Sequence, residues 1–169
     1  EIEAVLRAAD LLTSAALAVG TPLHDAIDGA CVDSRLASPG CLFVALPGER
    51  TDGHRFVDDA VQRGAVAALV AAEKLPAVRT SLYGSATLIP VADTLRGLHA
   101  IARAWRIRFP MLKRIGVTGS NGKTTTKEMI ASMLAAADAT VFSRGNYNSD
   151  IGLPLEILRV RDTHRYGVF

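Results

Sequence analysis

A strand-like segment runs straight into a glycine-rich loop and then into a helix near the middle of the chain. Residues Ile115–Thr118 have strand character, Gly119–Gly122 form the loop, and Lys123–Ala136 continue as a helical pattern. A second strand follows at 140–143, a helix at 153–158 and a third strand at 166–169. This alternation predicts the opening of a doubly wound parallel sheet, with the glycine loop at its first turn from strand to helix.

The loop carries the chemistry of a phosphate site. Its glycines let backbone N–H groups approach an anion, and the helix N-terminus adds unpaired donors and partial positive charge. Lys123 supplies a full charge to the β- and γ-phosphates, and the Thr124 hydroxyl can bind Mg²⁺. The sequence therefore predicts an ATP and Mg²⁺ site, with Lys123 and Thr124 as its catalytic groups. The predicted nucleotide contacts are Thr118, Gly119, Ser120, Asn121, Gly122, Lys123, Thr124 and Thr125.

The loop departs from the standard phosphate-binding pattern, which is Gly, four residues, then Gly-Lys-Ser/Thr. Counting back from Gly122 places Val117 where the first glycine should stand, and Gly119 comes two positions later. A glycine turn that only links a strand to a helix is the alternative. Such a turn does not need a lysine and threonines directly after its last glycine. Thr125 and Thr126 remain open to a simpler interpretation as residues of the first helical turn.

The first half of the chain also alternates helix and strand. The pattern predicts helices at 2–18 and 53–63, strands at 30–33, 41–46, 66–70 and 86–91, and a long helix that begins at Asp93 or Thr94 and ends before Pro110. The inner stripe of this long helix is Leu95, Leu98, Ile101, Ala102 and Trp105. We expect an α/β protein with a small N-terminal α/β domain over residues 1–92 and the first half of a phosphate-loop sheet over 93–169.

Composition gives no positive sign of several classes of function. The net charge is +2, which does not by itself indicate nucleic acid or a membrane surface. The most basic stretch, Arg103 to Arg114, is expected to be the solvated face and exit of a helix. Cys31 and Cys41 fit no metal-ligand spacing, and two free thiols indicate a reducing compartment. We expect no secretory signal and no membrane-spanning helix, and therefore a cytoplasmic protein.

The variant loop, Gly119-Ser120-Asn121-Gly122-Lys123-Thr124-Thr125-Thr126, resembles that of the Mur ligase family and its relative folylpolyglutamate synthase. Asp33-Ser34-Arg35 and the stretch from Pro39 to His54 are similar to the uridine-nucleotide-binding domain of these ligases. Lys127-Glu128-Met129 and the stretch from Gly145 to Pro154 resemble the member that adds D-alanyl-D-alanine. The resemblance covers roughly residues 30–169.

The resemblance implies an ATP-dependent amide ligase of peptidoglycan precursor synthesis. Its substrates would be UDP-N-acetylmuramoyl-tripeptide and D-alanyl-D-alanine, joined through an acyl phosphate, and we expect a monomer that needs no nucleic acid. By resemblance, Ser34 and Arg35 would line the uridine-diphosphate pocket with His54 nearby, and Asn146 and Asn148 would face the reacting groups. The alternatives are a surface turn for Ser34 and Arg35, a helix cap for His54, and local turn formation for the two asparagines.

Three other functions remain open. The first is the ligase that adds the third, diamino residue, which shares most of the pattern. The second is a non-catalytic nucleotide-binding module that uses the same loop. The third and weakest is a kinase-like phosphate-loop protein, which the missing first glycine disfavours. The chain begins at Glu1 and stops at Phe169 within an apolar run, so both ends look cut. The family's acidic metal ligand, modified lysine, adenine pocket and C-terminal domain would lie beyond Phe169. We therefore expect this chain alone not to catalyse ligation.

Overall fold

The computed structural model describes residues 27–48, 51–78, 86–144 and 149–169. The chain divides into two compact units, residues 1–101 and 102–169, and each is described by itself. The division falls inside a helix, nine residues later than the predicted boundary after residue 92, which stays a prediction. The predicted helix at 2–18 lies outside the described residues.

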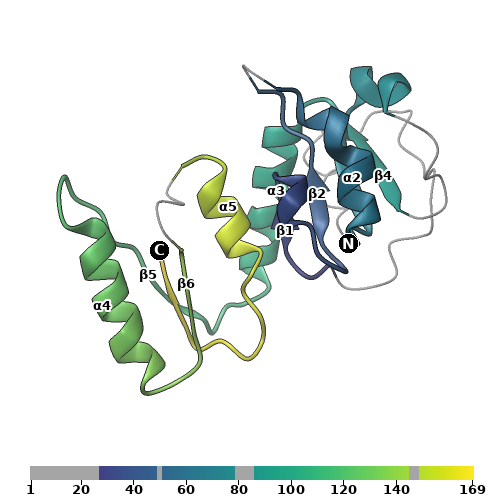
Figure 1. The fold of residues 1–169 in the computed structure, drawn as a ribbon. Coiled ribbons are helices and arrows are strands. Elements are labelled where there is room, and N and C mark those ends of the chain that lie inside the picture. The colour runs from purple at the N-terminus through teal and green to yellow at the C-terminus, as the bar shows by residue number, and fades with distance from the viewer. Residues whose placement is uncertain (1–26, 49–50, 79–85, 145–148) are drawn as a thin grey trace. The chain divides into compact units, whose positions relative to one another are not determined.

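The first unit is built on a four-stranded parallel sheet with the order β1-β2-β3-β4 (Figure 1). Its strands are β1 (Ala30–Cys31), β2 (Leu42–Val44), β3 (Ala67–Ala71) and β4 (Thr87–Val91). All four predicted strands are confirmed, although each is shorter than or shifted slightly from its predicted range. Almost every residue of β2, β3 and β4 is buried, as expected of parallel strands that are covered on both faces.

Alternate strand residues pack on opposite sides of this sheet. Phe43, Ala68 and Val70 join the core cluster under α2 (Val57–Gln62), which follows the 3₁₀ turn η2 (Gly53–Phe56). The other face meets α3 (Thr94–Ile107), where a Cβ placed on Gly97 would lie 2.8 Å from Leu69 Cδ2. The predicted helix at 53–63 is thus confirmed in position but begins with a 3₁₀ turn. Two more 3₁₀ turns, η1 (Ser34–Leu36) and η3 (Ala72–Ala77), complete the described connections.

The start of α3 agrees with the sequence pattern. Asp93 Oδ1 accepts hydrogen bonds from the backbone N–H groups of Leu95 at 2.9 Å and Arg96 at 3.0 Å, so Asp93 is the cap and Thr94 the first helical residue. Within the predicted inner stripe, Leu98, Ile101 and Ala102 are buried, whereas Leu95 and Trp105 are partly exposed.

A glycine at the end of α2 offers a test of the first unit. Gly64 has φ +110°, and a Cβ there would lie 2.9 Å from both Cα and N of Pro39. Gly29 has a similar φ of +89° but open space around it. We expect Gly64→Ala to lower the free energy of unfolding by about 2 kcal/mol and Gly29→Ala by about 1 kcal/mol, because only the first adds a backbone clash to the strain of a positive φ. Urea denaturation measures the free energy of unfolding of both variants. An equal loss of stability in Gly64→Ala and Gly29→Ala would contradict the role of the clash with Pro39.

The second unit contains a three-stranded parallel sheet with the order β5-β7-β6. Its elements are β5 (Lys113–Ile115), α4 (Lys123–Ala135), β6 (Thr140–Phe142), α5 (Gly152–Ile157) and β7 (Tyr166–Val168). The chain crosses from β5 past β7 to β6 and then returns to β7. Because both crossovers of a parallel sheet are right-handed, this reversal places α4 and α5 on opposite faces, as Figure 1 shows. The predicted doubly wound α/β architecture is confirmed.

A small core with aromatic members packs in this unit. The rings of Trp105 and Phe109 meet edge to face at 5.4 Å, and Trp105 Nε1 donates to the Val160 carbonyl at 3.0 Å. Phe109 packs with Leu112, Val141 and Val160. In the part of the chain that the structure describes, no helix has the length and apolar character needed to cross a membrane.

Candidate functional site

The glycine loop lies between β5 and α4, at the carboxyl end of the first strand. Gly119 has φ +148° and Gly122 has φ +72°, and a Cβ on either would meet nothing closer than 3.8 Å. The two glycines are therefore needed for the direction of the backbone and not for close packing. Residues 118–122 are all exposed, so the loop presents its backbone to the solvent at the edge of the sheet.

The N-terminus of α4 is open to an anion. Among the described residues, no side chain caps this helix, and Gly122 occupies the cap position. The first backbone bond along the helix runs from the Thr126 N–H to the Gly122 carbonyl, at 2.9 Å. The N–H groups of Lys123, Thr124 and Thr125 thus have no partner within the helix. Such donors and the helix dipole together favour a phosphate at this point.

Lys123 reaches back over the loop. Its Nζ donates to the Gly119 carbonyl at 2.6 Å and approaches the Ser120 carbonyl at 3.5 Å. The ammonium group thus lies against the backbone carbonyls at the start of the glycine loop. This places a full positive charge beside the open N–H groups of α4. The exposed hydroxyl of Thr124 lies one residue further along the same turn.

The structure explains why valine stands where the standard loop has its first glycine. The Val117 N–H donates to the Phe169 carbonyl at 2.7 Å, and the Phe169 N–H donates to the Ile115 carbonyl at 2.9 Å. These two hydrogen bonds continue the pairing beyond the ends of β5 and β7 as far as Val117, which is partly buried. The loop proper begins only at Thr118. The standard first glycine would fall two residues after β5, at a position whose N–H is still paired with the neighbouring chain segment, where a β-branched residue is favoured.

One residue at this edge of the sheet was missed as a site candidate. Lys127 is 5% exposed, and its Nζ donates to the Ser143 carbonyl directly after β6. It lies four residues after Lys123, so both lysines share one face of α4. That spacing is the signal in the sequence that could have identified it. Lys127 ties the helix behind the loop to the exit of the neighbouring strand.

Two predicted ligand residues of the first unit point to different surroundings. Ser34 is 5% exposed, and its hydroxyl bonds the Asp59 carboxylate on α2, the largest cause of the lowered pKa of Asp59. The Arg35 side chain is 80% exposed and forms a forked pair with Asp33, with Nε to Oδ1 at 2.9 Å and Nη2 to Oδ2 at 2.5 Å. Arg35 is thus held at the surface after β1 with its guanidinium paired to Asp33, whereas Ser34 fixes the turn on which it sits. The role of Arg35 and Ser34 as ligand residues stays a prediction.

His54 has both ring nitrogens occupied by protein groups. Nδ1 lies 2.6 Å from Asp52 Oδ1, and Nε2 accepts the backbone N–H of Ala71 at 2.8 Å. Because Nε2 is an acceptor, Nδ1 carries the proton. The bond from the His54 side chain is also the main reason that the pKa of Asp52 is lowered. His54 thereby joins the turn before η2 to the end of β3, and its role as a ligand residue stays a prediction.

The buried hydrogen bond at His54 leads to a test. We expect His54→Leu to lower the free energy of unfolding by about 2 kcal/mol, because it leaves the Ala71 N–H without its acceptor. Arg35→Ala, at an exposed site, should change it by less than about 0.5 kcal/mol. Urea denaturation of both variants checks this, and equal stability of His54→Leu and the unchanged chain would contradict the assigned role.

The remaining predicted residues, Asn146 and Asn148, lie outside the described residues. The segment that carries them begins two residues after Ser143, the carbonyl held by Lys127. Their assignment stays a prediction.

Comparison with known protein families gives matches over both units. Residues 26–106 match a model described as "Mur ligase family, catalytic domain", and residues 117–169 match the "Mur ligase middle domain". Together the two models account for most of the chain and for both sheets.

Individual relatives carry more specific names. A UDP-N-acetylmuramoyl-tripeptide--D-alanyl-D-alanine ligase of Treponema pallidum is 43% identical over 84% of this chain and 32% of its own length. A UDP-N-acetylmuramoyl-L-alanyl-D-glutamate--2,6-diaminopimelate ligase of Chlorobaculum tepidum is 41% identical over 77% of this chain and 25% of its own length.

Solved structures show the same fold. MurF of Acinetobacter baumannii superimposes with a TM-score of 0.76 and 34% identity, covering 99% of this chain and 34% of its own. MurF of Thermotoga maritima, solved in complex with ADP, has a TM-score of 0.64 and 32% identity, covering 84% of this chain and 31% of its own. The chain thus spans about a third of the length of these relatives.

Proposed function

Because the chain belongs to the Mur ligase family, we propose that it supplies the uridine-nucleotide unit and the phosphate loop of an ATP-dependent ligase that adds D-alanyl-D-alanine to UDP-N-acetylmuramoyl-tripeptide. The observation that carries the proposal is the open N-terminus of α4 with Lys123 placed over the loop. The names of the most similar relatives support the choice of substrates.

The loop would reduce the repulsion between the two anions that react in the first step. A carboxylate oxygen of the muramoyl peptide attacks the γ-phosphorus of ATP, ADP leaves, and an acyl phosphate forms. Two anions must approach each other, so positive charge has to be present before they meet. Lys123 and the N–H groups of Gly122–Thr125 would hold the β- and γ-phosphates. Mg²⁺ would supply further positive charge there, and the exposed Thr124 hydroxyl fits the role of holding it.

The second step needs no nucleophilic side chain. The amine of D-alanyl-D-alanine attacks the acyl carbon, phosphate leaves, and the new amide nitrogen gives up a proton. In the first unit, Arg35 would pair with the diphosphate of the uridine nucleotide, since a guanidinium binds phosphate oxygens in a fork. The Ser34–Asp59 bond and the His54 contacts would hold the surrounding turns. We propose a cytoplasmic, monomeric enzyme.

The ligase that adds the third residue is the second candidate, because one such relative is 41% identical. Phosphate release by the complete ligase that carries this chain separates the two. We expect turnover with the tripeptide substrate and D-alanyl-D-alanine, and none with the dipeptide substrate and diaminopimelate. The opposite preference would establish the second candidate. The 169-residue chain alone should release no phosphate in either mixture, and robust turnover would sink that part of the proposal.

A further inference from the structure

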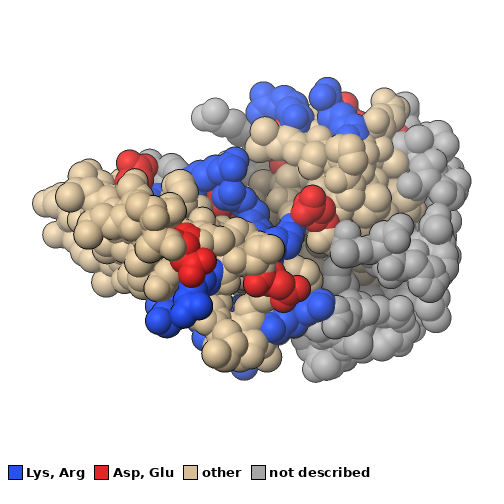
Figure 2. Space-filling model, turned by 90° about the horizontal axis from the view of Figure 1, so that it is seen from below, with Lys and Arg blue, Asp and Glu red and all other residues tan. Residues whose placement is uncertain are grey.

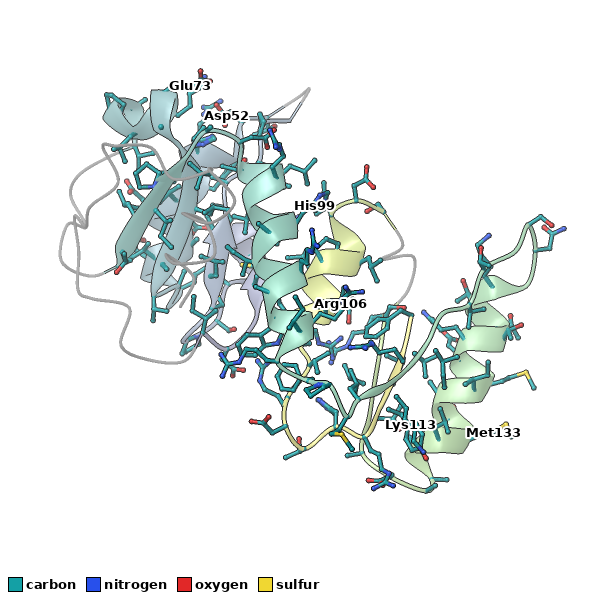
Figure 3. All side chains as sticks on the ribbon, turned by 180° about the vertical axis from the view of Figure 1, so that it is seen from behind. Asp52, Glu73, His99, Arg106, Lys113 and Met133 are labelled. Atoms are coloured by element: carbon teal, nitrogen blue, oxygen red, sulfur yellow. The ribbon has the colours of Figure 1, made fainter. Side chains whose placement is uncertain are left out.

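The turn between α3 and β5 has an unusual surface. We call residues 106–114 the basic corner; its sequence is Arg-Ile-Arg-Phe-Pro-Met-Leu-Lys-Arg. No Asp or Glu occurs in the sequence between Asp93 and Glu128. Figure 3 labels Arg106 at the end of α3 and Lys113 on β5, the two ends of this corner. The sequence predicted a solvated helix face and exit here, and the exposure of its cations agrees with that prediction. The exposed apolar side chains of the segment were not predicted.

Three cations of the basic corner are available to an anionic partner. Arg106, Lys113 and Arg114 are exposed, and none pairs with a carboxylate in the described part of the chain. Arg114 Nη1 lies 3.5 Å from the Arg106 carbonyl, which keeps these two residues together. Elsewhere in this unit, arginines are used differently: Arg159 pairs with Glu156, and Arg165 pairs with Asp138. Figure 2 shows one face of the molecule, on which both Lys and Arg and Asp and Glu are exposed.

Two large apolar side chains of the same segment are also exposed. Met111 is 87% exposed, the highest value among the exposed large apolar residues of the described chain, and Ile107 is 64% exposed, with only Met133 of α4 between them at 73%. Both belong to a nine-residue segment whose other apolar members, Phe109 and Leu112, are buried in the aromatic core. Exposed apolar groups and exposed cations in one short segment are the combination by which a protein lies on an anionic membrane, with its cations at the headgroups.

Other anionic partners fit this corner less well. A single-stranded nucleic acid needs an open ring on which its bases can stack. Here Arg108 and Arg161 lie over the Trp105 ring at 4.8 and 5.8 Å, and Lys113 lies 5.6 Å from the Tyr166 ring centroid. Phe109 is buried. A specific protein interface uses about 20–30 residues a side, many more than this corner offers.

We propose that the basic corner attaches the protein reversibly to an anionic phospholipid surface. Arg106, Lys113 and Arg114 contact the lipid phosphates, and Met111 and Ile107 enter the boundary between headgroups and acyl chains. The contact is peripheral, and no part of the chain crosses the bilayer. The attachment stands independently of the proposed ligase function, since none of its residues belongs to the phosphate loop.

Co-sedimentation of the full 169-residue chain with vesicles tests the proposal. We expect binding to vesicles containing phosphatidylglycerol and not to pure phosphatidylcholine, with release in 0.5 M KCl because salt screens the charges. The double variant Lys113→Glu/Arg114→Glu should lower the partition coefficient by about twentyfold or more, at roughly fivefold for each cation removed. Met111→Asp should lower it by at least about fivefold, because a charge replaces an inserted apolar group.

The matched control is Met129→Asp on α4. Met129 is also exposed, at 61%, but its neighbour in sequence is Glu128 and it lies outside the basic corner. This variant should change vesicle binding by less than about twofold. Thermal melting of each variant checks that the substitutions at exposed sites leave the fold intact. Failure of the unchanged chain to bind anionic vesicles, equal loss in Met111→Asp and Met129→Asp, or binding of RNA in place of vesicles would each overturn the proposal.

Discussion

Replacing Lys123 with methionine is expected to weaken ATP binding by about thirtyfold, because hydrogen bonds that involve charged groups contribute about 1.5–3 kcal/mol. Methionine keeps the length of the side chain and removes only its ammonium group. The Lys123 Nζ lies over the loop, 2.6 Å from the Gly119 carbonyl, so the lost charge is one that faces the phosphate site directly. Isothermal titration of each protein with ATP and Mg²⁺ measures the effect.

The matched control is Lys74→Met. Lys74 is a partly exposed lysine of the first unit, 3.5 Å from Asp52, and belongs to neither the loop nor α4. ATP should bind this variant as it binds the unchanged chain. Equal weakening in both variants would mean that the loss reflects overall charge and not the phosphate loop.

The second large effect concerns the core of the first unit. Phe43 lies on the central part of β2, is 0% exposed and belongs to the cluster beneath α2. We expect Phe43→Ala to lower the free energy of unfolding by about 3–5 kcal/mol, the cost of lost burial together with the cavity that remains. Phe142→Ala removes the same side chain from a site that is 38% exposed on β6, and should cost less than about 1.5 kcal/mol.

The chain contains one tryptophan, which lets this experiment distinguish the two units. Trp105 lies in the second unit, so its fluorescence reports the unfolding of that unit. Far-UV circular dichroism reports both units together. For Phe43→Ala, we expect the circular dichroism transition to move to lower urea by more than the fluorescence transition. Equal shifts would show that the two units unfold as one.

The order of strands and helices could be predicted from the sequence because the chemistry is local. Apolar runs such as Cys41–Leu46 are continuous, as parallel strands buried on both faces require, and Gly64 and Pro110 mark helix ends. The parallel, doubly wound arrangement of the second sheet could also be predicted from a local pattern, the glycine loop that joins a strand to a helix. Strand ends were less certain, since the ladder through Val117 depends on a partner 52 residues away, Phe169.

The details of the site depended on contacts that sequence spacing does not contain. The family resemblance made His54 a ligand candidate, but whether its Nε2 is free depends on Ala71, 17 residues further along. The burial of Lys127 depends on the carbonyl of Ser143 in the next strand. The valine at the position of the standard first glycine is explained by its hydrogen bond to Phe169, directly after β7. In each case the hydrogen-bond partner is distant in sequence and is brought close by the folding of the chain.

The most direct test of the account is a pair of titrations that treats the two units as separate nucleotide sites. The chain is titrated with ATP and Mg²⁺ and, independently, with UDP-N-acetylmuramoyl-tripeptide. We predict that both bind, that Lys123→Met loses only ATP, and that Arg35→Ala loses only the uridine substrate. Competition between the two ligands for one site, or absence of uridine-dependent binding, would contradict the assignment of this chain to the front part of a Mur ligase active site.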